Sequence, residues 1–138
     1  RAAGPSLWNE TVVWSDSRSF STEPYQCNEL FSYDLEMWSE LQLTDDSVCK
    51  RSPKTNGRYL VYTRNIEPRN EAASDFRLRD FVTDEELVLA PAWGQVGYFD
   101  ISDRYVVWSQ YRGVTSPKGR DIVYYVLEAG EMGYGRGH

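Results

Sequence analysis

Three stretches of this chain read Leu30-Phe-Ser-Tyr-Asp-Leu35, Phe76-Arg-Leu-Arg-Asp-Phe81 and Ile122-Val-Tyr-Tyr-Val-Leu127. They begin at positions 30, 76 and 122, so both intervals are 46 residues. A fixed period of about 20 to 50 residues is typical of repeat architectures. The sequence therefore predicts three copies of one structural unit in a chain of 138 residues.

Each copy contains the same parts in the same order. Before the middle stretch, a turn leads into two aliphatic residues and an aromatic one, at Val12-Val-Trp14, Leu60-Val-Tyr62 and Val106-Val-Trp108. After the middle stretch comes a short outer segment, at 40–44, 86–90 and 131–134. Val, Tyr, Trp, Phe and Thr favour strands, whereas the Asn, Asp, Gly, Ser and Pro between them favour turns. We expect four short strands per copy and essentially no helix.

The run of consecutive apolar residues in each second strand is typical of a strand that is covered on both faces. Four-stranded antiparallel units with covered faces describe the blades of a β-propeller, where each sheet packs between two neighbours. The residues also resemble a known family: 12–18, 30–35 and 40–44 are similar to the units of TolB-like β-propeller repeats. The resemblance runs from Pro5 to about Tyr134. It implies an all-β fold. It also implies that residues 1–138 form one propeller segment of three four-stranded antiparallel blades, at 5–45, 53–90 and 98–134.

The copies also differ from one another. Arg18 and Arg112 occupy aligned positions in the first and third copies, and the second copy has no arginine at that position. The third copy has Val126 where the others have Asp34 and Asp80, and it lacks the Leu-Thr ending of the first copy. Terminal repeats are often atypical. We therefore expect the third copy to be the end of the array.

Composition excludes several classes of function. The net charge of −6 argues against a nucleic-acid partner, because phosphate binding needs a basic surface. No run of about 18 apolar residues is present, so no membrane span is expected. The chain opens at Arg1 without a methionine or an apolar signal region, which is expected of a mature product or an excised fragment.

The two cysteines are placed so that they can pair. If residues 29–35 and 40–44 form a hairpin about a turn at 36–39, opposed residue numbers sum to about 75 or 76. Cys27 and Cys49 would then face each other just beyond the paired region. The alternative is two buried free thiols in a cytosolic protein. We predict a disulfide between Cys27 and Cys49, and with it an extracellular or periplasmic location.

Residues for catalysis or cofactor binding are scarce. The only histidine is the last residue, His138, and no Cys/His spacing suggests zinc. Acidic pairs such as Asp45-Asp46 and Glu85-Glu86 lie at turns or strand starts, without the ligand spacing of a calcium loop. We therefore predict no catalytic residue, no metal and no cofactor, and the chain is not expected to be an enzyme.

Two arginines interrupt the pattern of the middle strands. Arg77 and Arg79 occupy positions that are aromatic or aliphatic in the other copies: Phe31, Tyr33, Val123 and Tyr125. One interpretation is an exposed outer face on which the aliphatic stems lie. The other is a contact surface for an acidic or carboxylate-bearing partner, which the planar guanidinium group suits. With Arg18 and Arg112, these residues are our candidate partner contacts.

Three blades also bear on function. Closed propellers use about 4 to 8 blades. In a set of three, the first and last blades would each lack one neighbour, so one face of the apolar runs at 12–14 and 106–108 would be uncovered. We expect a non-catalytic interaction and assembly module with a protein partner: it either self-assembles or forms part of a larger propeller. One alternative is the propeller portion of an extracellular hydrolase or polysaccharide lyase, because resembling blades accompany peptidase and lyase chemistry. Another alternative is a glycan-binding module.

Overall fold

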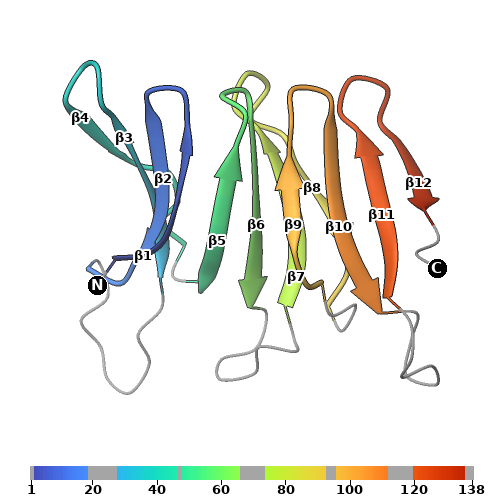
Figure 1. Ribbon diagram of the computed structural model, residues 1–138. Coiled ribbons are helices and arrows are strands. Elements are labelled where there is room, and N and C mark those ends of the chain that lie inside the picture. The colour runs from blue at the N-terminus through green and yellow to red at the C-terminus, as the bar shows by residue number, and fades with distance from the viewer. Residues whose placement is uncertain are drawn as a thin grey trace.

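A computed structural model shows three four-stranded antiparallel sheets standing side by side (Figure 1). It describes residues 2–18, 28–46, 48–65, 74–92, 96–111 and 120–135. The first sheet contains β1 (Ala2–Trp8), β2 (Thr11–Asp16), β3 (Glu29–Asp34) and β4 (Ser39–Gln42). The second contains β5 (Lys50–Thr55), β6 (Tyr59–Asn65), β7 (Ser74–Asp80) and β8 (Glu86–Ala90). The third contains β9 (Phe99–Ile101), β10 (Tyr105–Tyr111), β11 (Arg120–Val126) and β12 (Glu131–Gly135).

The strands of each sheet follow one another in chain order, and every pairing is antiparallel. The described residues contain no helix. The expected all-β fold with four strands per copy is therefore confirmed.

The 46-residue period is also a period of backbone conformation. The turn between the third and fourth strands of each sheet has a residue in the left-handed region, with φ of 56°, 60° and 66° at Trp38, Asp84 and Gly130. At the start of this turn, a backbone N–H donates to a carbonyl oxygen before the second strand, in the pairs Leu35–Glu10, Phe81–Arg58 and Leu127–Arg104. The three hairpins are therefore built alike, although their side chains differ.

The first strands of the first and second sheets begin earlier than the sequence suggested. β1 and β5 start three residues before Pro5 and Pro53, the positions at which we expected the units to begin. Both strands have a register shift at this point, with Gly4 and Ser52 at positive φ. A bulge leaves one residue out of the ladder, so a proline that lacks an N–H can follow without breaking the sheet.

The hairpin of the first sheet also has a different register from the one expected. Its turn covers residues 35–38, one position earlier than expected, so that Asp34 lies opposite Ser39. The Asp34 carboxylate accepts hydrogen bonds from the backbone N–H groups of Glu36 at 2.9 Å and Met37 at 3.0 Å, which holds the turn there. The register from which we placed the two cysteines opposite each other is therefore wrong.

Hydrophobic cores fill the two seams between the sheets. In the first seam, between the first and second sheets, Val13 and Leu30 pack with Leu60 and Tyr62. The second seam, between the second and third sheets, is larger, and its buried residues are Tyr59, Val61, Phe76, Leu78, Leu89, Ala90, Val106, Trp108, Val123 and Leu127. β6 supplies residues to both seams. Of the three second strands, it alone is covered on both faces along its apolar run.

A close contact at the first seam predicts a glycine requirement. Gly57 has a φ of 95°, and a Cβ built on it would lie 2.3 Å from the Trp8 ring of the first sheet. We expect Gly57→Ala to lower the free energy of unfolding by about 2 to 4 kcal/mol, because it adds overpacking to left-handed backbone strain. Urea denaturation measures the loss.

Gly4→Ala is the matched control. Gly4 also has a positive φ, but its Cβ would meet nothing closer than the Ser52 Cα at 3.9 Å. This variant should lose only about 1 kcal/mol, from backbone strain. Equal losses in the two variants would mean that Trp8 makes no steric demand on the turn.

Candidate functional site

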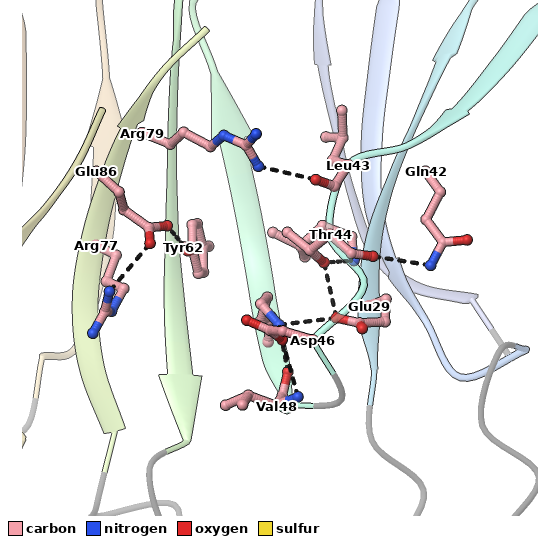
Figure 2. A network of polar contacts seen from close by, with 12 residues as sticks. Glu29, Gln42, Leu43, Thr44, Asp46, Val48, Tyr62, Arg77, Arg79 and Glu86 are labelled. Atoms are coloured by element: carbon pink, nitrogen blue, oxygen red, sulfur yellow. Dashed lines mark hydrogen bonds and ion pairs between the residues drawn. The ribbon is translucent and has the colours of Figure 1, made fainter. Parts of the chain in front are cut away.

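A buried ion pair joins the first two sheets (Figure 2). The Lys50 ammonium donates to Glu29 Oε1 at 2.9 Å, and the two side chains are only 1% and 2% exposed. Lys50 also binds the Asp46 carboxylate and the Val48 carbonyl oxygen, and the Thr44 hydroxyl donates to the same Glu29 oxygen. Burial alone would raise the pKa of Asp46, but hydrogen bonds from Lys50 and Val48 outweigh it and lower that pKa. The network ties β3 to β5.

Arg77 lies in the first seam, not on an outer face. Its Nε donates to Asp75 at 3.1 Å, and its Nη1 donates to Glu86 at 3.1 Å. The Tyr62 hydroxyl donates to the other oxygen of Glu86. Burial raises the pKa of Glu86, and the nearby Asp46 carboxylate adds to the effect. The acidic partners that Arg77 needs are therefore supplied by its own sheet.

Arg79 crosses the same seam. Its Nη1 donates to the Leu43 carbonyl oxygen of the first sheet at 3.0 Å (Figure 2). The rest of its guanidinium group binds Asp84. Both Arg77 and Arg79 have mostly buried side chains, so the interpretation as an exposed outer face is wrong. Their role as contacts for an external partner stays a prediction.

Arg18 lies on the outer face of the first sheet, which is turned away from the other two described sheets. Its guanidinium carbon lies 4.5 Å from the centre of the Phe31 ring, which also stacks on Trp14 at 6.0 Å. Arg18 donates to Asp16 at 2.9 Å and to Glu40 at 2.8 Å. As a result Phe31 is only 3% exposed, whereas the Arg18 side chain is 45% exposed.

The same arginine controls the ionisation of Asp16. Burial would raise the pKa of Asp16, but hydrogen bonds from Arg18 and from the Trp14 indole N–H outweigh it, so that pKa lies well below its usual range. Asp16 therefore stays charged and holds Arg18 over the ring. Arg112, the aligned arginine of the third copy, lies outside the described residues.

The outer face of the third sheet exposes apolar side chains. Tyr105, Val107, Ile122 and Tyr124 are 41%, 39%, 44% and 39% exposed. The equivalent positions of the second sheet are buried in the second seam, with Tyr59, Val61, Phe76 and Leu78 only 9%, 0%, 0% and 4% exposed. Residues 106–108 were expected on this face. Ile122 and Tyr124 were not, although the alternation of side chains along β11 could have revealed them.

Comparison with solved structures identifies this arrangement. A structure described as a TolB from Agrobacterium tumefaciens matches 97% of this chain with a TM-score of 0.64 and 13% sequence identity. The Pyrococcus horikoshii acylaminoacyl peptidase matches 98% of this chain with a TM-score of 0.59 and 11% identity. The three sheets have the fold of TolB-like propeller blades. No family model and no curated protein matches the sequence.

The chain is shorter than both of these proteins. It spans 48% of the TolB chain and 25% of the peptidase chain. At 13% and 11% identity the likeness shows the fold alone. The first, second and third sheets are called blades 1, 2 and 3 below.

A polar pocket of about 220 Å³ opens between blades 2 and 3, and its lining residues are Arg51, Ser52, Thr63, Asn65, Ser74, Val96, Gly97 and Phe99. Arginine, amide and hydroxyl groups could bind a small polar molecule, but this lining contains no Asp, Glu, His or Cys for acid–base chemistry. Within the described ranges, no three His, Cys, Asp or Glu residues lie close enough together to hold a metal ion. No described helix could cross a membrane.

The predicted disulfide stays a prediction, because Cys27 lies outside the described residues, as does His138. The residues that follow the two cysteines are nevertheless hydrogen-bonded to each other: the Lys50 N–H donates to the Asn28 carbonyl oxygen at 3.0 Å. This contact arises from the connection between blades 1 and 2, and not from the hairpin register that we expected. It supports the pairing of Cys27 with Cys49.

The buried ion pair should contribute strongly to stability. We expect Lys50→Met to lower the free energy of unfolding by about 3 to 5 kcal/mol, because the Glu29 carboxylate would stay buried without its cation. Adding Glu29→Gln should restore part of the loss, since the amide is neutral and its oxygen can still accept from Thr44. Chemical denaturation measures both variants.

Lys54→Met is the control, from the same strand. Lys54 donates to the Phe99 carbonyl oxygen at 2.9 Å and lies 3.9 Å from the exposed Asp100 carboxylate. Its replacement should cost about 1 kcal/mol. If Lys50→Met were no worse than this control, the ion pair would have no special role in joining the blades.

The cysteine pairing predicts protection from alkylation. Intact-mass analysis after alkylation without a reductant should find neither Cys27 nor Cys49 modified, and both modified after reduction. Reduction should also lower stability by about 3 kcal/mol, as expected for a closed loop of this length. Two alkylated thiols in freshly isolated, unreduced protein would refute the pairing.

Proposed function

We propose that this chain is a non-catalytic interaction and assembly module, which packs further blades against the outer faces of its first and third blades. The observation that carries the proposal is the difference between equivalent positions in blades 2 and 3. Val61 and Phe76 are fully buried by a neighbouring blade, whereas Val107 and Ile122 at the same positions are about two-fifths exposed. A contiguous exposed apolar face usually marks a protein interaction site.

The energetics favour covering these faces. Burial of apolar surface contributes roughly 25 cal/mol per Å², and the exposed side chains include two tyrosines, a valine and an isoleucine on blade 3 alone. Tyr124 lies over Gly133, where a Cβ would meet its ring at 2.3 Å, so this tyrosine packs on the backbone of its own blade. Tyrosine has only two rotatable side-chain bonds, so ordering it in a contact costs little side-chain entropy.

The non-catalytic part of the proposal rests on the charged groups that the structure describes. Lys50, Arg77 and Arg79 form ion pairs with acids of the same chain, which explains them as structural residues. The proposed partner is a protein, not a nucleic acid, in keeping with the net charge of −6. An extracellular or periplasmic location follows from the predicted disulfide.

The alternative is a propeller portion of an extracellular hydrolase or polysaccharide lyase, or a glycan-binding module. The similarity to an acylaminoacyl peptidase, of which this chain spans 25%, favours the hydrolase. Binding of the isolated chain to members of a peptide or glycan array would favour this alternative over an assembly role.

The assembly role predicts association that depends on the outer faces. Light scattering should find the wild type above its monomer mass of 16.0 kDa at micromolar concentration. Val107→Lys combined with Ile122→Lys should restore the monomer, because two charges would have to be buried in the contact. Val82→Lys, at an exposed turn position on blade 2, is the control and should associate like the wild type.

A stable, monodisperse wild-type monomer would overturn the proposal, since three blades could then stand alone with both faces open. Association that persists unchanged in the double variant would also overturn it, because another surface would be responsible.

A further inference from the structure

We infer that the partner of these faces is a second copy of this chain, with the outer face of blade 3 in one copy packed on the outer face of blade 1 in the next. This inference rests on the proposed function and names its partner. Each blade has a front face, turned toward the preceding blade, and a back face, turned toward the following one. Within the described ranges, no blade packs on the front of blade 1 or on the back of blade 3.

The front face of blade 1 has the chemistry of the front face of blade 3. Five positions are equivalent by strand register. Blade 3 has Ile101, Val106, Trp108, Val123 and Tyr125 at these positions, and blade 1 has Leu7, Val12, Trp14, Phe31 and Tyr33. Blade 2 has a different set: Thr55, Leu60, Tyr62, Arg77 and Arg79. Blade 1 therefore has a front face of the type that fits the back of blade 2.

The back face of blade 3 is similar to the back face of blade 2. Four equivalent positions are Tyr59, Val61, Phe76 and Leu78 in blade 2, and Tyr105, Val107, Ile122 and Tyr124 in blade 3. The first two residues are identical in type, and all eight are aromatic or aliphatic. Blade 1 differs, with Thr11, Val13, Leu30 and Ser32. The back of blade 3 is therefore of the type that packs on an apolar front.

Joining the two uncovered faces would reproduce the second seam. There, Phe76 on the back of blade 2 contacts Trp108 on the front of blade 3, with ring centres 5.3 Å apart. In the contact between copies, Ile122 would take the place of Phe76, and Trp14 the place of Trp108. Leu7, which is 65% exposed, would take the place of the partly buried Ile101.

The charges are compatible with this contact. The four apolar positions on the back of blade 3 include no carboxylate, so an arginine that reaches across a seam, as Arg79 of blade 2 does to the Leu43 carbonyl oxygen, would find no charged acceptor at these positions. Blade 1 avoids this cost. Its one arginine on the front face, Arg18, already binds Asp16 and Glu40 of its own blade, and it can remain at the rim of the contact.

In this arrangement the contact forms between copies. The first and third blades lie at opposite ends of the row, so the described blades of one copy do not reach each other's outer faces (Figure 1). The front and the back are different surfaces, which makes the contact heterologous. Two copies supply six blades, within the range of about 4 to 8 that closed propellers use.

Complementation between two variants tests this arrangement. Leu7→Asp blocks the front face and Ile122→Asp blocks the back face, each with a charge at an already exposed position. Each variant alone should be monomeric by sedimentation velocity, because every front-to-back contact would include a blocked face. A mixture should form a 1:1 complex of twice the monomer mass, because one pair of faces is intact. Val82→Asp should behave like the wild type.

These experiments distinguish a failure of the inference from a failure of the proposed function. If Leu7→Asp alone still associates while Ile122→Asp does not, the contact joins two back faces; the inference then fails, while the proposed function stands. A stable wild-type monomer overturns both. Val107→Asp and Tyr33→Asp provide a second pair of variants, and far-UV circular dichroism identifies any variant that fails to fold. If both pairs fold and neither mixture associates, the inference is wrong.

Discussion

The stability of this protein depends on covering both faces of each four-stranded sheet. A sheet with Val, Tyr, Trp and Leu on its two faces is stable in water only when neighbouring sheets remove those side chains from solvent. Blade 2 meets this condition, because β6 supplies buried residues to both seams. Blades 1 and 3 meet it on one side only. Among the described residues, the outer faces at both ends of the row are therefore open to a further contact, and the proposed function rests on this difference.

The two seams meet the same need with different chemistry. The second seam is an aromatic cluster in which Phe76 packs against Phe99 and Trp108. The first seam has smaller apolar residues and adds Lys50 with Glu29, and Arg79 with the Leu43 carbonyl. Buried ion pairs contribute little net stability compared with apolar packing, but they penalise a wrong neighbour strongly. The polar seam can therefore specify which blades are adjacent, while the apolar seam supplies most of the burial.

Parts of the fold and site were predictable because they depend on local patterns. The period, the four strands per copy and the two faces left uncovered at 12–14 and 106–108 follow from apolar runs and turn residues close together in the chain. The site was less predictable. Glu29 and Lys50 are 21 residues apart, and no spacing rule pairs them. The predicted turn of the first hairpin was wrong by one position, because the Asp34 side chain accepts hydrogen bonds from the backbone of the turn. A count of strand residues takes no account of such a bond.

The sequence by itself determined the all-β fold, the repeat and its resemblance to TolB-like blades, because strand and turn preferences act over a few residues. Tertiary structure alone decided the environment of each side chain. Arg77 and Arg79 turn into the first seam because their strand neighbours Tyr62 and Leu60 do. Arg18 lies over Phe31 because Asp16 and Glu40 come together from different strands. Such environments depend on which strands pack together, and that depends on residues far apart in the chain.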